Sequence, residues 1–279
     1  MQVAAVKVLA GLMLFIGYSM AHAAPKAELW ARWQKHDPVS RQKIDHGAWD
    51  KFLKRFVVTS HPSGINQVRY QAVTAEDLKQ LRAYLYSMQD IGISGYGRAE
   101  QKAFWINVYN AVTLDLILAR FPVKSIRDIN ISPGLLARGP WGAKLFSVEG
   151  EKISLDDIEH RILRPIWKDN RVHYALNCAS LGCPNLQPTA YTSETTEGLL
   201  ERGAKEFINH PRGVAIENGK LRVSSIYIWF QEDFGGDAED LMEHWLRYAN
   251  PKLAEALVKY SGGLSHDYDW RLNGSETKP

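Results

Sequence analysis

The stretch AFWINVYNAVTLDLILARF, residues 103–121, is the longest run of mostly apolar residues in the body of the chain. Its pattern predicts a helix over about Ala99–Phe121 that stops before Pro122, because a residue that precedes a proline disfavours helical geometry. Two asparagines and one aspartate interrupt the run, so it is a poor candidate for a membrane span. We therefore predict that it is the core helix of a soluble domain.

Two of these polar residues, Asn107 and Asn110, lie three positions apart and so share one face of the helix. Buried amide groups must be hydrogen-bonded, so each asparagine requires a partner. One interpretation is that each side chain fixes a neighbouring stretch of backbone. The other is that they belong to a site, in which Asn107 assists catalysis by orienting a histidine or donating to an oxyanion, and Asn110 contributes to binding.

The rest of the chain mixes helices with a few strands. Thr74 followed by Asp77 resembles a capping box, and Asn218-Gly219 is the strongest short signal for a hairpin. Because no βαβ alternation is present, we predict the α+β class, with a helix-rich single domain packed around a small antiparallel sheet. The expected helices lie at 49–56, 74–88, 99–121, 154–163, 195–209, 237–249 and 251–260, and the expected strands at 65–73, 171–178 and in the hairpin 213–225.

The N-terminus has the pattern of a secretory signal peptide. Lys7 precedes an apolar run at 8–18, and the A-x-A pattern that follows predicts cleavage after Ala23. The apolar run is shorter than the roughly 20 residues that span a bilayer, which argues against an uncleaved anchor. We expect a periplasmic or secreted protein with a signal peptide at 1–23, one domain at 24–273 that begins with a helical part at about 24–60, and a flexible tail at 274–279.

Composition argues against several functional classes. With 45% hydrophobic and 23% charged residues, the chain can form a core and is not expected to be disordered. The formal net charge of +3, which falls by one when Lys7 is removed, and the lack of a basic stripe argue against a nucleic-acid partner. No cofactor is expected. The expected partner is a small-molecule or peptide-like substrate.

Both cysteines of the chain lie in RVHYALNCASLGCPNL, residues 171–186. In an oxidising compartment, a disulfide between Cys178 and Cys183 is the first alternative. A metal site could add His160 and His173, but the spacing fits no common zinc module, so no metal is expected. The third alternative is a nucleophilic Cys178, which requires a nearby histidine or dipole to form the thiolate.

The sequence favours His160 over His173 as that histidine. If residues 171–178 form a strand, His173 lies on the face opposite Cys178 and is a structural or rim residue of the binding site. His160 lies on the preceding helix, where it could approach the thiol. The alternative for His160 is a surface histidine that is paired only with acids of its own helix.

Three acids accompany His160 in the sequence. Asp156 and Asp157 lie four and three residues before it, on its own side of the helix, so either could orient the imidazole. Glu159 points about 100° away on a helix and orients His160 less naturally. It could instead reach Cys178 or a substrate amine.

Four stretches resemble the family called domain of unknown function 547 (DUF547). SIYIWFQEDFG (225–235) and YDWRLN (268–273) extend the resemblance, which covers roughly Trp49–Asn273. Members of the family are exported bacterial proteins and C-terminal domains of plant proteins that carry a leucine-zipper segment. The four stretches are KAFWINVYNAVTL (102–114), FPVKSIRDI (121–129), SLDDIEHRILR (154–164) and HYALNCASLGCP (173–184).

The resemblance implies which polar positions matter, although it implies no reaction. The position of Cys183 is a serine in plant members, which does not suit an obligatory disulfide and favours an active-site role for Cys178. The most persistent polar positions of the family correspond to Asn107, Asn110, Glu159, His160 and Cys178.

These observations predict a cysteine-dependent hydrolase or acyltransferase that acts on an amide or peptide-like substrate. Cys178 would attack, His160 would act as the general base, and the backbone N–H groups of residues 179–182 would bind the oxyanion. Papain-like and transglutaminase-like enzymes place the cysteine before the histidine, so this chain would be a permuted or distant relative of them, or a convergent enzyme.

Two other functions remain open from the sequence. One is a non-catalytic periplasmic binding module for a peptide, a small thiol or a cell-wall fragment, with Asn110, His173 and Cys183 in its site. The other is a structural or interaction protein with a disulfide between Cys178 and Cys183.

Overall fold

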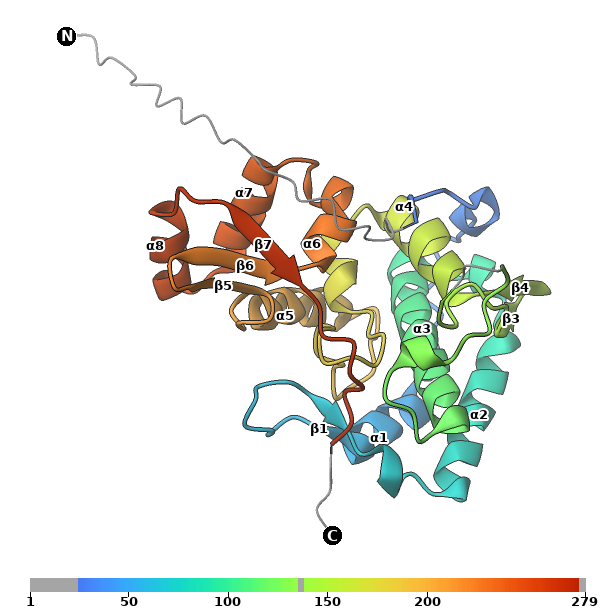
Figure 1. The fold of residues 1–279 in the computed structure, drawn as a ribbon. Coiled ribbons are helices and arrows are strands. Elements are labelled where there is room, and N and C mark those ends of the chain that lie inside the picture. The colour runs from blue at the N-terminus through green and yellow to red at the C-terminus, as the bar shows by residue number, and fades with distance from the viewer. Residues whose placement is uncertain (1–24, 135–137, 276–279) are drawn as a thin grey trace.

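The long apolar stretch forms the central helix α3 (Arg98–Arg120) of the computed structural model, which describes residues 25–134 and 138–275 (Figure 1). Residues 100–114 of α3 are all buried. The helix is covered by α2 (Ala75–Gln89), by the π-helical segment η5 (Asp157–Leu163) and by α5 (Thr196–Ile208). A helix that is apolar around most of its circumference is expected in such a central position.

Most predicted helices are confirmed, and their starts follow the expected local chemistry. Thr74 and Asp77 form a reciprocal capping box at the start of α2. Asn250 caps the last helix through a hydrogen bond with the Leu253 N–H group. The remaining helices are α1 (Gly47–Phe56), α4 (Arg164–Trp167), α6 (Ile226–Trp229), α7 (Ala238–Tyr248) and α8 (Pro251–Val258), and the 3₁₀ turns are η1 (Ala31–Gln34), η2 (Tyr70–Ala72), η3 (Ile93–Gly95), η4 (Ile126–Asp128), η6 (Asn170–Tyr174) and η7 (Gln231–Phe234).

The strands form three small sheets, so the fold is α+β and rich in helices, as predicted. In the predicted hairpin, Asn218 and Gly219 both have positive φ, of 52° and 72°, as a tight hairpin turn requires. The largest sheet is mixed rather than antiparallel, because helices α7 and α8 return the chain to the free edge of β6, where β7 pairs in parallel. The strands are β1 (Val57–Val58), β2 (Gln67–Val68), β3 (Phe146–Val148), β4 (Glu151–Ile153), β5 (Val214–Glu217), β6 (Lys220–Ser224) and β7 (Leu264–Asp267).

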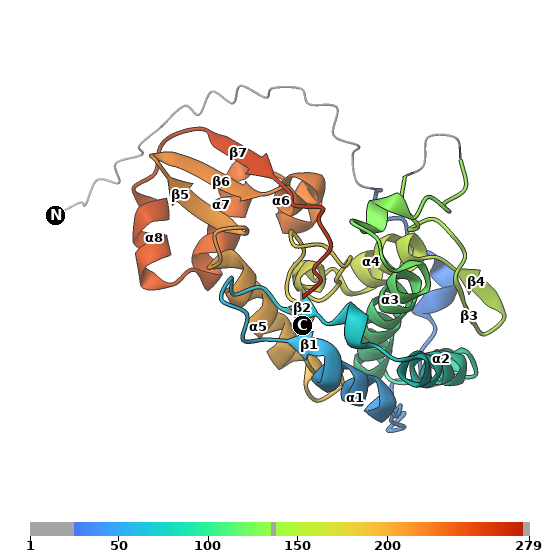
Figure 2. The ribbon, with the colours of Figure 1, turned by 60° about the horizontal axis from the view of Figure 1, so that its bottom comes forward.

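Two hydrophobic cores divide the fold into halves, which Figure 2 shows on either side of the C-terminal segment. The larger core surrounds α1, α2, α3 and η5, and the smaller one lies between α5, α7, α8 and the β5–β6–β7 sheet. After β7 the chain passes between the halves and bonds with the loop that carries the cysteines and with the segment after α3. The Gly182 N–H group donates to Asp269 O at 2.8 Å, and Leu272 donates to Lys124 O at 2.8 Å. The C-terminal segment therefore fixes the boundary where the candidate site lies.

The predicted strand at 171–178 is wrong. Its first part is the 3₁₀ turn η6, and the residues that follow have no partner strand. Residues Val172–Ser180 are all buried, so their alternation of residue types does not mark one exposed face and one covered face.

Of the two predicted terminal segments, only Gly274 and Ser275 of the tail lie within the described residues. The signal peptide at 1–23 and the tail residues 276–279 lie outside the described residues. Gly274 and Ser275 were assigned to the flexible tail, but they pair with Val68, to which Ser275 donates a backbone hydrogen bond of 2.9 Å. None of the described helices has the length and apolar character needed to cross a membrane.

Candidate functional site

The loop that carries the two cysteines is held by the central helix. Asn110 of α3 donates to Ala175 O at 2.9 Å and accepts from the Asn177 N–H group at 2.8 Å. The loop can therefore be fixed without belonging to a sheet, because one buried amide satisfies two of its backbone groups. Asn110, expected in the binding site, acts as a clamp on this loop.

Asn107, expected to be catalytic, clamps a different segment. Its amide donates to Tyr191 O at 2.8 Å and accepts from Tyr191 N–H at 3.0 Å. No hydrogen bond joins it with His160 or with either cysteine in the described part of the chain. Asn107 therefore fixes a neighbouring stretch of backbone, which is the first of the two interpretations given for it above.

Both cysteines are free thiols and both are buried, Cys178 at 9% exposure and Cys183 at 4%. The sulfur of Cys183 accepts the N–H group of Cys178 at 2.9 Å and the hydroxyl of Tyr268 at 3.1 Å. The sulfur of Cys178 lies 3.1 Å from the same hydroxyl and 3.2 Å from Ser180 Oγ. These four side chains, Cys178, Ser180, Cys183 and Tyr268, form what we call the thiol cluster.

The thiol cluster favours ionisation of Cys183 rather than of Cys178. Burial opposes ionisation of Cys183, but hydrogen bonds from Cys178 and Tyr268 outweigh it and lower the pKa of this thiol. Burial and the neighbouring Cys183 sulfur raise the pKa of Cys178. Of the two thiols, Cys183 is therefore the one that ionises more readily.

The backbone at the thiol cluster is strained at one residue. Ala179 has φ of 58°, in the left-handed region that non-glycine residues rarely adopt. Its N–H group donates to Asn177 Oδ1 at 2.9 Å, and the Asn273 N–H group donates to Ala179 O at 3.0 Å. Such strain persists only where the surroundings enforce it, and it is concentrated at functional sites.

The loop leaves few free donors for an oxyanion. The N–H groups of Ala179, Leu181 and Gly182 donate to Asn177 Oδ1, Arg271 O and Asp269 O. Of the expected oxyanion donors at 179–182, only the N–H group of Ser180 lacks an acceptor within the described residues. The expected set of donors is thus reduced to one backbone group and the adjacent hydroxyl of Ser180.

Glu159 and His160 lie on a π-helical segment rather than on the expected α-helix. π-helical turns occur mostly as short segments and often at functional sites. Glu159 accepts the Tyr109 hydroxyl at 3.2 Å, and its other oxygen lies 3.7 Å from His173 Nδ1 and 4.0 Å from His160 Nδ1. Glu159 is therefore the carboxyl group between the two histidines, a position that α-helical geometry does not predict.

Burial raises the pKa of Glu159 to about 8, although Arg164 and Tyr109 favour its charged form. At neutral pH this carboxyl group is mostly protonated. The negative charge of Cys183 also contributes to this rise, so Glu159 lies within electrostatic reach of the thiol cluster.

His160 does not have the environment of a general base. Burial and the adjacent guanidinium of Arg164, which lies 3.1 Å from Nδ1, lower the pKa of His160 to about 3. No hydrogen bond or ion pair joins His160 with Cys178 in the described part of the chain. The expected Cys178–His160 pair is thus not formed, because the histidine faces Arg164 and the cysteine faces Tyr268.

The two aspartates expected to orient His160 have different positions. Asp156 Oδ1 lies 3.6 Å from His160 Nε2, which is longer than a hydrogen bond. Asp157 instead caps the helix start through Ser154, whose N–H and hydroxyl groups both donate to Oδ2 at 2.8 Å, and it pairs with Lys144 and Arg161. Asp157 is a structural residue here.

His173 belongs to a buried ionic network. Its Nε2 lies 2.6 Å from Asp233 Oδ2, and its ring stacks on Phe230 at 4.2 Å. Arg164 binds both oxygens of Asp233, at 2.5 and 3.1 Å. His173 thus connects Asp233 with Glu159, and we call Glu159, His160, Arg164, His173 and Asp233 the acid–histidine cluster.

Three further residues of the two clusters were not predicted from the sequence, namely Tyr268, Asp233 and Arg164. Tyr268 and Asp233 lie in YDWRLN and SIYIWFQEDFG, and Arg164 ends SLDDIEHRILR, so all three belong to stretches that carried the family resemblance. Nothing in their spacing relates them to residues near position 178, because the contacts form only when the C-terminal half folds back.

An aromatic cluster borders the thiols. The Tyr268 ring lies 4.9 Å from Trp229 and 4.6 Å from Trp270, and Trp270 contacts Trp141 at 5.8 Å. All four rings are partly exposed. Aromatic surfaces of this kind suit the apolar faces of peptides and sugars.

No metal site is evident among the described residues, where no three His, Cys, Asp or Glu side chains converge as ligands. A comparison with curated proteins and a comparison with solved structures each gave no match. A comparison with family models gave one, "Protein of unknown function, DUF547", over residues 93–208. This range includes all nine site residues expected from the sequence, whereas Tyr268 and Asp233 lie beyond it. By this comparison, residues 93–208 of the chain match the model of the DUF547 family.

Proposed function

We propose that this protein is a cysteine-dependent hydrolase or acyltransferase that acts on an amide or peptide-like substrate. The observation that carries the proposal is the thiolate environment of Cys183, whose sulfur accepts the Cys178 N–H group at 2.9 Å and the Tyr268 hydroxyl at 3.1 Å. A thiolate is the nucleophilic form of cysteine, and buried thiols without such partners are inert.

Cys178 is the attacking group in this proposal, and Cys183 replaces His160 as the base. The Cys178 thiol interacts directly with the Cys183 sulfur, so its proton can pass to Cys183 as the bond to the substrate carbonyl carbon forms. Cys178 is also the more exposed of the two thiols. The oxygen of the tetrahedral intermediate would face the N–H and hydroxyl groups of Ser180.

The second half of the reaction requires an acid for the leaving amine. Glu159, with a pKa of about 8, carries a proton at neutral pH and can supply it when the C–N bond breaks. The thioester on Cys178 is then released by water or by another acceptor. His173 and Asp233 hold Glu159 in place, which makes them positioning residues.

Acylation with p-nitrophenyl acetate tests this function. We expect a burst of p-nitrophenol close to one equivalent of protein, and one acetyl group on the peptide that carries Cys178. Cys178→Ser should remove both signals, and Cys183→Ser should slow the burst at least tenfold because the base is lost. Acetylation that is confined to lysines, or that is unchanged in Cys178→Ser, would contradict the proposal.

Thiol–disulfide exchange is a second candidate, and the direct interaction of the two sulfurs favours it. In that reaction, a disulfide such as oxidised glutathione is reduced to two thiols while Cys178 and Cys183 form an intramolecular disulfide. Treatment with oxidised glutathione would then remove two protons from the peptide with both cysteines. A dithiol that stays reduced at the glutathione potential of an oxidising compartment would exclude it.

The signal-peptide pattern of residues 1–23 supports a further proposal, that the protein acts in the periplasm or outside the cell. Fractionation of cells that express the full chain, with N-terminal sequencing of the product, tests both export and cleavage after Ala23.

A further inference from the structure

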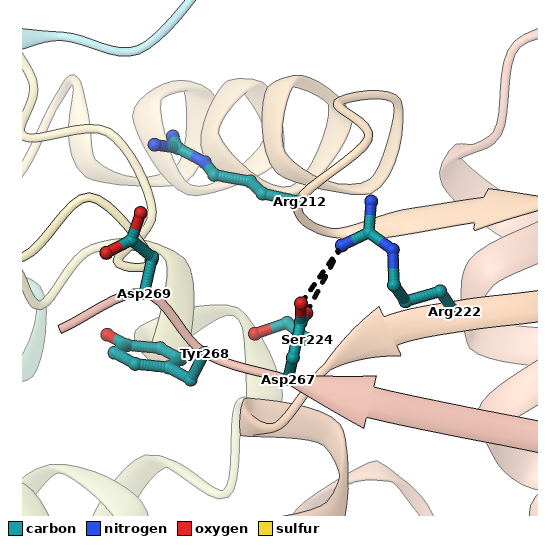
Figure 3. A pocket seen from close by; sticks show the side chains of 7 residues that line it. Arg212, Arg222, Ser224, Asp267, Tyr268 and Asp269 are labelled. Carbon is teal, nitrogen blue, oxygen red and sulfur yellow. Dashed lines mark hydrogen bonds and ion pairs between the residues drawn. The ribbon is translucent and has the colours of Figure 1, made fainter. Parts of the chain in front are cut away.

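A small pocket lies beside the thiol cluster (Figure 3). It encloses about 190 Å³, which is below the ~300–1,000 Å³ of sites for drug-sized ligands and suits a group of amino-acid size. Tyr268 forms part of its wall, and the hydroxyl of this tyrosine contacts both cysteine sulfurs. The lining residues are Gly182, Arg212, Arg222, Ser224, Asp267, Tyr268 and Asp269.

Both carboxylates of the pocket have arginine partners. Asp267 pairs with Arg222 at 3.2 Å, and Asp269 pairs with Arg271 at 2.5 Å. The side chain of Asp267 is 65% exposed and, among the described residues, contacts only Arg222, so it keeps lone pairs open to a donor, whereas both oxygens of Asp269 already accept hydrogen bonds from Arg271. This side of the pocket can accept N–H groups from a ligand.

Arg212 differs from Arg222 and Arg271 because no carboxylate of the described residues pairs with it. Its guanidinium donates to Leu181 O at 2.9 Å and to Asn185 Oδ1 at 2.6 Å, which are both neutral acceptors. Its Nε–H group is buried without an acceptor. Burial lowers the pKa of Arg212 to about 10, although the nearby Cys183 favours the charged form of the guanidinium.

We propose that this pocket binds the carboxylate-bearing end of a peptide-like substrate, with the carboxylate at Arg212 and an N–H or ammonium group at Asp267. The ligand would lie against Tyr268, whose hydroxyl contacts both thiols. The inference rests on the proposed acyl transfer and narrows its substrate class to peptides or amino-acid amides with a free carboxylate.

Calorimetric titration of the full chain with L-alanyl-L-alanine and with L-alanyl-L-alaninamide tests the proposal. Because only the first has a carboxylate, we expect it to bind at least tenfold more tightly. Arg212→Gln should remove this difference. Arg82→Gln, which removes an arginine paired with Asp115 on the surface of α2 and α3, should preserve it.

Equal affinities of the two dipeptides, no binding of either, or an unchanged preference in Arg212→Gln would overturn the proposal. If Arg212→Gln does not fold, the comparison on the native chain still decides, with acetate as the competitor expected to weaken only the binding of the free acid. The burst with p-nitrophenyl acetate requires no carboxylate, so a failure of the pocket and a failure of the thiol chemistry are distinguishable.

Discussion

The backbone N–H group of Cys178 donates a 2.9 Å hydrogen bond to the sulfur of Cys183. Five positions separate the two residues in the chain, and the left-handed conformation of Ala179 turns the loop so that one cysteine stabilises the charge of the other. This contact favours ionisation of Cys183, whereas the sequence suggested a thiolate on Cys178. The reactivity of the pair therefore depends on groups that hold the loop in this shape.

Tyr268→Phe should raise the apparent pKa of the thiol pair by about one unit. A hydrogen bond to a charged group contributes about 1.5 kcal/mol or more, and one pKa unit corresponds to about 1.4 kcal/mol. The rate of iodoacetamide alkylation as a function of pH measures this value. Tyr260→Phe is the control, because its hydroxyl bonds with Gly263 O and with the Leu221 N–H group and not with a thiol. Equal profiles for the two variants would exclude the role of Tyr268.

Asn110→Ala and Asn107→Ala form a matched pair on one helix. Each removes a buried amide that makes two hydrogen bonds with backbone, so each should destabilise the protein by about 2–4 kcal/mol. Only Asn110 holds the cysteine loop, so only its replacement should also change the pH profile of thiol alkylation. Urea denaturation and alkylation measure the two effects. A changed profile in Asn107→Ala alone would contradict the assignment.

Gly182→Ala should loosen the C-terminal segment from the cysteine loop. An added Cβ would lie 2.8 Å from the Asp269 backbone nitrogen, and overpacking of this kind costs about 1–3 kcal/mol. Because Tyr268 would move with Asp269, the thiol pKa should rise as well. Gly198→Ala in α5 meets no atom within 4 Å and should instead stabilise the protein by up to about 1 kcal/mol. Thermal denaturation separates the two outcomes.

Glu159→Gln should make stability less dependent on pH. The folded pKa of Glu159, about 8, lies above its unfolded value of roughly 4.3, so the folded state binds the extra proton between these limits. Stability is therefore lost as the pH rises from about 4.3 to about 8, by up to about 1.4 kcal/mol per unit, and the loss is complete above the folded pKa. Glutamine cannot ionise and keeps a partner for the Tyr109 hydroxyl. Urea denaturation at several pH values should show a smaller decline for the variant, and parallel curves would contradict the raised pKa.

The sequence predicted the helices well because their signals are local. The apolar pattern of α3, the Thr74 capping box and the Asn218-Gly219 turn each depend on residues a few positions apart, and each forms as expected. The same use of local patterns gave a wrong prediction for residues 171–178. Its alternating pattern resembles a strand, but every residue from Val172 onward is buried, and Asn110 of a distant helix satisfies its backbone.

The sequence predicted several residues of the candidate site, but it did not predict which of them contact one another. Cys178, Glu159 and His160 were identified as candidates, but the acids lie in other positions than the sequence suggested. The π-helical turn gives Glu159 a place between His160 and His173, whereas Asp157 caps the helix. An α-helical reading of the spacing places the acids differently, because a π-turn changes which residues share a face.

The sequence by itself determined the class of the fold, the match of residues 93–208 with the DUF547 model, and the two stretches from which the candidate chemistry comes, since these depend on local patterns. Only the tertiary structure decided which groups meet. The segment after β7 brings Tyr268 onto both thiols. Asp233 joins Arg164, 69 positions earlier in the chain, and His173, 60 positions earlier. Hydrogen-bond partners and burial set the pKa of Cys183 and of Glu159, and both are properties of the folded chain that no residue carries alone.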